Sequence, residues 1–271
     1  MSVDPRVLPF LKWPGGKRWA SPRIAALIRE RLTKTYFEPF LGGGAVFFEL
    51  RPRLAVLSDI NAELINAYLQ VRDSPRELIR QIKRLPVSKN VYDRLRLAEP
   101  KDPIRRAVRF LYLNRTAFGG IYRLNLDGKF NVPYGGGERT PQVLWEKQIL
   151  KNASEALANV EIRATDFKSI LEVATKGDVV YCDPTYTVAH DRNGFIRYNE
   201  RNFSWADQVA LATSALKARQ RGVMVIISNA NHRSIRDLYS DAQFTIQQRR
   251  SRVSIDISKR RLVEELLICL R

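Results

Sequence analysis

The residues Asp183-Pro184-Thr185-Tyr186 place a carboxylate, a main-chain carbonyl and an aromatic ring directly after an apolar run at residues 178–182. We expect this run to form a short buried strand, and ligand clefts of open α/β sheets lie at the carboxyl ends of strands. The three groups suit a planar heterocycle with an exocyclic amine, because the ring can stack on its face while the two oxygens accept its N–H bonds. An ordinary junction between a strand and a turn is the alternative interpretation.

A glycine-rich stretch, Phe40-Leu41-Gly42-Gly43-Gly44, follows another predicted strand and precedes an apolar helix expected at residues 45–50. Glycine lets the main chain turn sharply and approach a ligand closely. Because no Gly-Lys-Ser/Thr follows, the stretch is not a P-loop, and it lacks the full dinucleotide fingerprint. Asp59 ends the next predicted strand, where an acid can accept both ribose hydroxyls of an adenosine. A helix N-cap is the alternative for Asp59, and the combination fits S-adenosylmethionine as well as NAD.

Further motifs stand along the chain in one order: Lys12-Trp13-Pro14-Gly15-Gly16-Lys17, Phe37-Glu38-Pro39-Phe40, Ser58-Asp59-Ile60-Asn61, Phe110-Leu111-Tyr112-Leu113-Asn114-Arg115, Tyr122-Arg123-Leu124-Asn125 and Lys129-Phe130-Asn131-Val132-Pro133-Tyr134-Gly135. With the two stretches above, they resemble the DNA adenine methyltransferase (Dam) family of bacteria and their phages. The resemblance runs from about residue 10 to about residue 270, nearly the whole chain. The family usually has proline where this chain has Thr185, which makes the turn looser. Activity is expected to survive, because the other three residues of that turn are intact.

The resemblance implies that the cofactor is S-adenosylmethionine. It assigns cofactor binding to Trp13, Lys17, Glu38, Phe40, Gly42, Gly44, Asp59, Ile60, Asp166, Phe167 and Asp183. By the resemblance, Trp13 and Lys17 lie near the methionine end, with the Lys17 ammonium available to its carboxylate, and Asp166-Phe167 contacts the adenine. The alternatives are a solvated surface lysine for Lys17 and a helix cap with an apolar staple for Asp166-Phe167.

The same resemblance makes Asp183, Pro184 and Tyr186 the catalytic residues of an adenine-N(6) methyltransferase. The Asp183 carboxylate and the Pro184 carbonyl can hold both hydrogens of the amine and direct its lone pair at the methyl group. Tyr186 would stack on the flipped base. The sulfonium is already a good leaving group, so no metal is required. Methylation of a ring carbon would need a nucleophilic cysteine, and neither Cys182 nor Cys269 is suitably placed.

A base inside a duplex must be flipped out to reach such a cleft. By the resemblance, Phe118-Gly119-Gly120-Ile121 pushes into the base stack; a core position is the alternative for Phe118. Asp127-Gly128 between extended residues predicts a hairpin over residues 122–132, and a two-stranded ribbon fits the major groove. By the resemblance, Arg123 reads a guanine of a short palindrome such as GATC, although the residues beside Phe118 leave the exact site open. The candidate DNA-binding residues are Arg115, Phe118, Ile121, Arg123, Asn125, Lys129 and Asn131, with Arg115 and Lys129 expected on phosphates.

Apolar runs alternate with helical patterns along most of the chain. They predict strands at residues 36–40, 54–58, 160–164, 179–183, 223–228, 244–249 and 262–269, and helices at residues 18–32, 45–50, 62–73, 168–173, 205–221 and 234–239. This alternation indicates a parallel sheet covered on both faces, and the last two strands should pair as an antiparallel hairpin. We therefore expect an α/β fold, which the resemblance identifies as a Rossmann-like class I methyltransferase fold with a mostly parallel seven-stranded sheet.

The alternation breaks between residues 73 and 159, where helical stretches at residues 75–85, 91–97 and 103–114 precede the predicted hairpin. We expect residues 73–159 to be a mainly helical target-recognition insertion that binds DNA. Residues 1–72 and 160–271 would then form the catalytic domain that binds S-adenosylmethionine.

The chain carries 46 Lys and Arg against 28 acidic residues, a formal net charge of +18 at pH 7. This charge favours a polyanionic partner, here double-stranded DNA. The clusters at residues 105–109, 219–221, 249–252 and 259–261 indicate a long groove rather than one membrane-binding helix. With no long apolar run and no signal peptide, we expect a cytoplasmic protein of bacterial or phage origin. We expect it to act as a monomer, with a restriction endonuclease as a candidate partner, and its two cysteines to be buried reduced thiols.

Other functions remain open from the residues alone. The same turn chemistry suits the exocyclic amine of cytosine, or a base in RNA. A DNA-binding regulator with a vestigial methyltransferase fold is a second class, against which the intact Asp183 and Tyr186 argue. A dehydrogenase is the third, because the glycine stretch and Asp59 also fit NAD.

Overall fold

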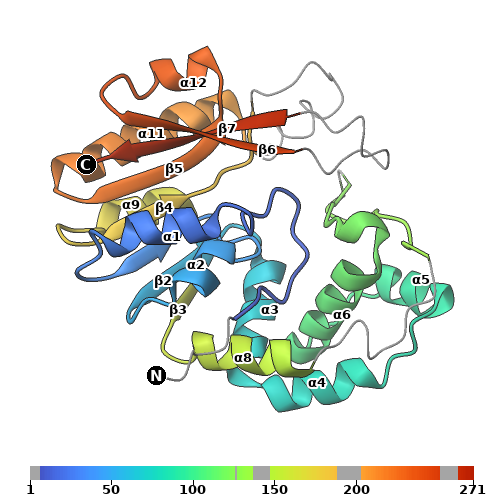
Figure 1. Cartoon of the computed structure of the whole chain (residues 1–271). Coiled ribbons are helices and arrows are strands. Elements are labelled where there is room, and N and C mark those ends of the chain that lie inside the picture. The colour runs from blue at the N-terminus through green and yellow to red at the C-terminus, as the bar shows by residue number, and fades with distance from the viewer. Residues whose placement is uncertain (1–6, 126, 137–146, 188–202, 251–261) are drawn as a thin grey trace. The chain divides into compact units, whose positions relative to one another are not determined.

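The computed structural model describes residues 7–125, 127–136, 147–187, 203–250 and 262–271 (Figure 1). By its internal contacts the chain divides into two compact units. The first unit holds Met1–Arg29 and Leu41–Ala164, and the second holds Glu30–Phe40 and Thr165–Arg271. These units are defined by packing, and the division into a catalytic domain and an insertion at residues 73–159 stays a prediction.

Seven strands form one sheet in the order β3-β2-β1-β4-β5-β7-β6. Their bounds are β1 (Tyr36–Glu38), β2 (Ala55–Asp59), β3 (Glu161–Ala164), β4 (Val179–Cys182), β5 (Met224–Ala230), β6 (Gln243–Arg250) and β7 (Leu262–Leu270). Strand β4 runs parallel to β1 and β5, and β2 runs parallel to β3. Strand β7 is antiparallel to both β5 and β6. The predicted α/β fold, with a mostly parallel seven-stranded sheet and a C-terminal antiparallel pair, is confirmed.

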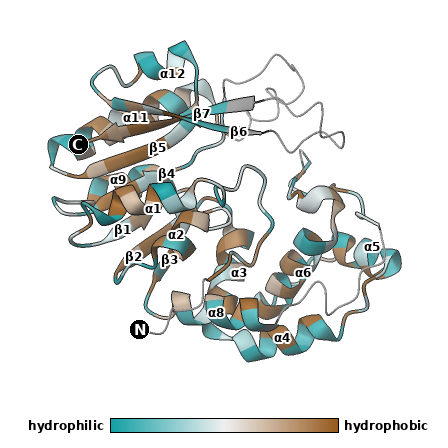
Figure 2. Cartoon of the chain, viewed as in Figure 1, coloured by the Kyte–Doolittle hydropathy of each residue, from teal (hydrophilic) through white to brown (hydrophobic). Residues whose placement is uncertain are grey.

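In the second unit, β4 and β5 are buried along their whole length, and β5 is largely hydrophobic (Figure 2). Such continuous burial is typical of parallel strands covered on both faces. The helices among the described residues of this unit are α9 (Phe167–Val173), α11 (Trp205–Gln220) and α12 (Arg233–Asp237). Helix α11 begins with a capping box in which Ser204 and Asp207 exchange side-chain and main-chain hydrogen bonds.

The first unit contains β2, β3 and most of the helices. These are α1 (Ser21–Arg29), α2 (Ala45–Leu50), α3 (Ala62–Asp73), α4 (Pro75–Lys83), α5 (Lys89–Leu97), α6 (Pro103–Thr116), the short 3-10 helix η1 (Phe118–Gly120) and α8 (Lys147–Leu157). Helix α3 packs against both α6 and α8. In the part of the chain that the structure describes, no helix is long and apolar enough to cross a membrane.

The predicted hairpin at residues 122–132 forms a turn with only short pairing on either side, and no regular strand is assigned to its described residues. Among the described residues, an antiparallel bridge joins Leu124 and Phe130, the Asn125 amide donates to the Lys129 carbonyl at 2.8 Å, and the Asn131 amide donates to the Arg123 carbonyl at 3.2 Å. The Asn125 side-chain oxygen also accepts the amide protons of Asp127 and Lys129, at 3.1 and 2.8 Å. Asn125 thus closes the turn through its own side chain, which competes with a regular ladder. Gly128, with φ of 72°, supplies the left-handed residue that the turn requires.

Candidate active site

The turn after β4 carries the residues that the sequence singled out first. Strand β4 is buried along its length, and Asp183 follows it in a half-buried position. The Tyr186 hydroxyl donates to Glu265 Oε2 at 2.9 Å, and Glu265 itself is buried on β7. Burial raises the pKa of Tyr186, and the negative charges of Asp183 and Glu265 raise it further. Tyr186 therefore stays protonated, and the hydrogen bond to Glu265 on β7 fixes the position of its hydroxyl group.

Beneath this turn lies a set of buried hydroxyl groups and a carboxylate. The Tyr181 hydroxyl lies 2.8 Å from Ser228 Oγ, and the Tyr36 hydroxyl donates to Glu38 Oε2 at 2.8 Å. Burial raises the pKa of both tyrosines. Glu38, at the end of β1, is only 3% exposed, so its carboxylate is buried in the protein interior.

The two cysteines are buried and reduced, as predicted. Burial raises the pKa of Cys182, and the charges of Asp183 and Glu38 raise it further. A thiol with a raised pKa is a poor nucleophile, which agrees with the exclusion of ring-carbon methylation.

Three aromatic rings of the second unit form a cluster after β1 and β3. The Phe40 and Phe167 rings are stacked, with centroids 5.5 Å apart, and Phe203 contacts both. Asp166 is the N-cap of α9 and accepts the Ser169 amide proton at 3.1 Å. The structural alternative for Asp166 is thus confirmed. It does not exclude a ligand, because a carboxylate has two acceptor oxygens.

In the first unit, Asp59 organises the glycine-rich loop. Asp59 Oδ2 accepts the Gly42 amide proton at 3.1 Å, and Oδ1 accepts the Asn61 amide proton at 3.0 Å. The N-cap of α3 is Asn61, whose side chain accepts from Glu63 and Leu64, so the capping alternative for Asp59 is wrong. Burial raises the pKa of Asp59, although main-chain hydrogen bonds oppose this. Next to it, Ile60 is 80% exposed.

The glycine loop lies under the indole of Trp13. A Cβ atom on Gly42 would lie 2.7 Å from Trp13 Nε1, and one on Gly44 would lie 2.8 Å from the Tyr68 hydroxyl. Both glycines also have positive φ, 47° and 65°. The loop therefore requires glycine for its conformation and for its packing.

Lys17 is buried, with 4% exposure, and its Nζ donates to the Gly15 carbonyl at 3.1 Å. The interpretation of Lys17 as an ordinary surface lysine is therefore wrong. Its ammonium group thus lies inside the protein, next to a glycine-rich segment.

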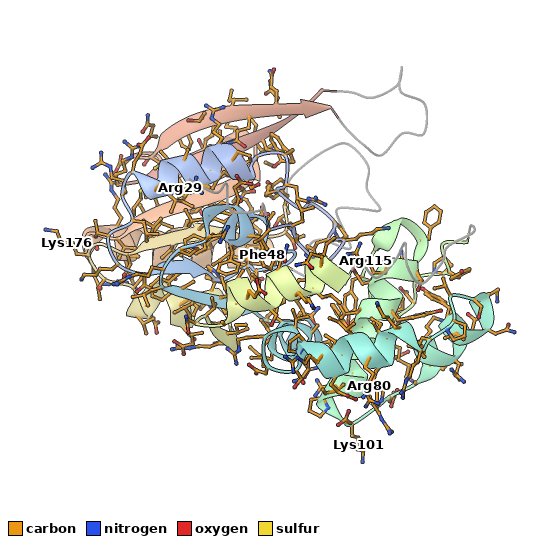
Figure 3. The ribbon with its side chains drawn as sticks, turned by 60° about the horizontal axis from the view of Figure 1, so that its bottom comes forward. Arg29, Phe48, Arg80, Lys101, Arg115 and Lys176 are labelled. Atoms are coloured by element: carbon orange, nitrogen blue, oxygen red, sulfur yellow. The ribbon has the colours of Figure 1, made fainter. Side chains whose placement is uncertain are left out.

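The recognition residues follow α6. Phe118 is 61% exposed and Ile121 is 37% exposed, so the core alternative for Phe118 is wrong. Arg123 Nε donates to Asn131 Oδ1 at 2.8 Å across the hairpin, and both side chains are exposed. Lys129 is exposed as well, and Arg115 lies at the carboxyl end of α6 (Figure 3).

Sequence reasoning assigned no role to Asn114, Tyr122 or Glu265, each of which contacts a segment that carries predicted site residues. The Asn114 side chain holds the main chain of Lys12, accepting its amide proton at 3.0 Å and donating to its carbonyl at 2.7 Å. The Trp13 and Tyr122 rings are stacked, with centroids 6.0 Å apart. Asn114 and Tyr122 belong to motifs that carry the family resemblance, but the sequence did not indicate what either residue does. Glu265 gave no signal, because it lies in an apolar strand far along the chain.

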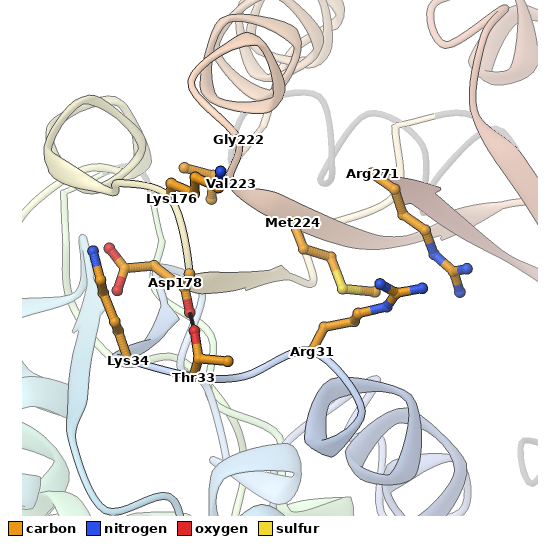
Figure 4. A pocket seen from close by; sticks show the side chains of 10 residues that line it. Arg31, Thr33, Lys34, Lys176, Asp178, Gly222, Val223, Met224 and Arg271 are labelled. Carbon is orange, nitrogen blue, oxygen red and sulfur yellow. Dashed lines mark hydrogen bonds between the residues drawn. The ribbon is translucent and has the colours of Figure 1, made fainter.

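A cavity of about 620 Å³ opens at the other end of β4 and β5 (Figure 4). It is lined by residues that precede these strands and β1, among them Thr33, Lys34, Lys176 and Asp178, and by Arg271 after β7. Ligand clefts of open parallel sheets lie at the carboxyl ends. We therefore place the candidate active site at Asp183 and not in this cavity.

The comparisons with known proteins agree with these features. The family model for D12 class N6 adenine-specific DNA methyltransferases matches residues 13–255. The chain is 38% identical over 243 residues to the type II methyltransferase M1.LlaDCHI of Lactococcus lactis subsp. cremoris, covering 86% of this chain and 84% of that protein. It is 33% identical over 266 residues to the DNA adenine methylase of Escherichia coli (strain K12), covering 95% and 93%. The structure is also similar to a solved precorrin 8w decarboxylase of Methanobacterium thermoautotrophicum, at 11% identity and a TM-score of 0.40, covering 98% of this chain and 95% of that chain. With the family model spanning most of its length, the chain belongs to the D12 class of N6 adenine-specific DNA methyltransferases.

Proposed function

We propose that the chain flips an adenine out of a short duplex site and methylates its exocyclic N6 by direct attack, with S-adenosylmethionine as the methyl donor. The observation that carries this proposal is the position of Asp183, Pro184 and Tyr186 at the carboxyl end of β4. Family membership favours adenine over cytosine and over a base in RNA.

The residues at the strand ends fit the cofactor. Asp59 accepts main-chain hydrogen bonds from Gly42, Asn61 and Ile60, and because a carboxylate has about four acceptor positions, it can still accept a ribose hydroxyl. Ile60 offers an exposed apolar surface to an adenine, and Gly42 and Gly44 allow close approach of the loop. Trp13 and the buried Lys17 would face the methionine end. Glu38, Phe40, Asp166 and Phe167 complete the proposed set.

S-adenosylmethionine supplies a methyl group on a sulfonium that is a good leaving group. In the proposed mechanism, Asp183 and the Pro184 carbonyl each accept one N–H of the adenine amine, which directs the nitrogen lone pair at the methyl carbon. The proton that N6 loses passes to Asp183 or to solvent. Tyr186 stacks on the base with its hydroxyl fixed by Glu265.

Recognition of DNA is assigned to the segment after α6. Phe118 and Ile121, both exposed, would fill the space that the flipped base leaves. Arg123 would read a guanine, with Asn131 orienting its guanidinium and Asn125 shaping the turn. Arg115 and Lys129 would contact phosphates. The proposed target is a short palindrome such as GATC.

The test of this proposal is Asp183→Ala. We expect it to lower the single-turnover methylation rate below a few per cent of the parent while DNA affinity is kept, because it removes the acceptor of the amine. The matched control is Asp178→Asn, a buried carboxylate at the opposite end of β4 that accepts the Thr35 and Thr175 amide protons. The control should methylate adenine normally. If Asp183→Ala does so too, as seen by mass spectrometry of digested DNA, the assigned site is wrong.

A further inference from the structure

Behind the turn that follows β4 lies a pair of fully buried side-chain amides, Gln208 on α11 and Asn229 on β5. Gln208 Nε2 donates to Thr187 Oγ1 at 3.1 Å and, over a longer 3.4 Å, to the Thr185 carbonyl. Gln208 Oε1 accepts from Asn229 Nδ2 at 2.9 Å. Both N–H groups of Gln208 are thereby directed at the turn.

The orientation of this pair is fixed by the main chain. Asn229 Oδ1 accepts the amide proton of Ala230 at 2.8 Å, so the Asn229 side chain can present only its NH₂ group to Gln208. Gln208 must then accept on Oε1 and donate from Nε2. The order from β5 through α11 to the turn is therefore set in one direction.

Both amides would be costly to bury without a purpose. Transfer of an amide into an apolar interior is unfavourable unless its hydrogen bonds are replaced. Helix α11 and strand β5 have their own main-chain hydrogen bonds, and apolar side chains at these two positions would keep them. What the two amides add is a connection to residues 185 and 187.

The turn is held at two further points. Thr187 is buried, and its Oγ1 donates to the Phe203 carbonyl at 2.8 Å. The Tyr186 hydroxyl donates to Glu265. Thr185 itself is exposed, and threonine does not fix φ as proline does. The conformation of this turn therefore depends on contacts from outside it.

We propose that Gln208 and Asn229 form an amide relay that positions the Asp183–Tyr186 turn for methyl transfer. This inference rests on the proposed function of that turn. The two amides touch neither base nor cofactor in this scheme; they are positioning residues that act through the main chain at residues 185–187. A displacement of about 1 Å in a reacting group can cost about a hundredfold in rate, so loss of the relay should appear in the chemical step.

The first test variant is Gln208→Met, which keeps the length of the side chain and removes all three hydrogen bonds. We expect the single-turnover methylation rate to fall by about ten- to a hundredfold, while the dissociation constants for S-adenosylmethionine and for DNA change by less than about threefold. Asp178→Asn is the matched control, since it also weakens hydrogen bonds of a buried side chain, but one that lies just before the opposite end of β4. It should lower the melting temperature without lowering the rate.

A second variant, Thr187→Val, removes only the hydroxyl that links Gln208 to Phe203, and it tests the relay if Gln208→Met does not fold. We expect a rate loss of about three- to tenfold. Adding Thr185→Pro to either variant should restore part of the rate, because proline fixes φ inside the turn. Rescue of this kind is not expected if the substitutions act only through global stability.

The outcomes separate the inference from the function on which it rests. If the parent methylates adenine, Asp183→Ala is inactive, and Gln208→Met or Thr187→Val matches the Asp178→Asn control in rate, the relay is wrong and the function stands. If Asp183→Ala keeps full activity, the proposed function of the turn fails first. A rate loss in the relay variants with unchanged affinities, reversed by Thr185→Pro, supports the inference.

Discussion

Asp59 combines two demands on one carboxylate. It accepts amide protons from Gly42 and Asn61, which holds the glycine loop in place, and it is proposed to accept the ribose hydroxyls of the cofactor. Burial raises its pKa above the ordinary value of 3.8. Protonation would turn one acceptor oxygen into a donor. The ionised form is therefore the one that fits a ribose diol, and the raised pKa moves its loss to a higher pH.

We expect the affinity for S-adenosylmethionine to fall as the pH is lowered toward the raised pKa of Asp59. Asp59→Asn should bind the cofactor about tenfold or more weakly at pH 7, since a hydrogen bond to a charged group contributes about 1.5–3 kcal/mol. It should then show a flatter response between pH 7 and pH 5. Calorimetric titrations of both proteins at several pH values measure this. If the affinity of both proteins falls equally with pH, the pH dependence arises from a titrating group other than Asp59.

The sequence could predict which residue types stand at the strand ends, but not which of two neighbours does which task. Asp59 and Asn61 are both good helix caps and lie two residues apart, and only the backbone geometry assigns the cap to Asn61. Lys17 could likewise be read as a surface residue, because burial of a lysine depends on its tertiary surroundings. The roles of Gln208 and Asn229 were out of reach for the same reason.

Among the elements, those with strong local patterns were predicted well. Strands β4 and β5 follow continuous apolar runs, and α11 begins within its predicted range. The hairpin was overestimated, because its turn is closed by the Asn125 side chain and none of residues 122–125, its first strand, is buried. A ribbon with one face exposed and few buried cross-strand pairs has little to hold a longer ladder. Its exposed side chains remain available to a partner.

Arg123→Ala should relax specificity at one guanine rather than weaken all DNA binding equally. A bidentate pair between arginine and guanine contributes about 1–3 kcal/mol of discrimination, so misreading should rise roughly five- to 150-fold at that position. Methylation rates on duplexes that differ at one recognition base measure this. Asn131→Ala should cause a smaller change at the same base, because it removes only the group that orients Arg123. An equal loss on every duplex would make Arg123 a phosphate contact.

At the scale of the whole molecule, the net charge is +18, but several of the arginines that contribute to it have partners within the protein. Arg106 pairs with Glu63, and Arg109 donates to the Leu95 and Arg96 carbonyls at the end of α5. Arg221 donates to the carbonyl of Leu171 in α9, and Arg219 to that of Arg271. The clusters at residues 105–109 and 219–221, which the sequence placed in a groove, thus contribute arginines that stabilise helix ends and the chain end. Net charge alone could not distinguish these arginines from those that face DNA.

Even so, the remaining excess of positive charge should make binding of DNA strongly dependent on salt. The logarithm of the association constant falls with the logarithm of salt concentration at about −0.9 per phosphate contacted, so six to ten contacts cost roughly 10³–10⁵ in affinity between 50 and 200 mM salt. We expect a slope in this range for a non-specific duplex, measured by fluorescence anisotropy. The affinity for S-adenosylmethionine should change little under the same conditions.

Single substitutions locate the contacts behind that slope. Lys129→Ala should make it shallower by about one, because Lys129 is exposed on the hairpin and is proposed to contact a phosphate. Lys101→Ala removes the same charge before the amino end of α6, whereas Arg115 lies at the other end of this helix (Figure 3). It should leave the slope unchanged. If the two variants shift the slope equally, the positive charge attracts DNA as a diffuse field and the hairpin has no special share in holding the backbone.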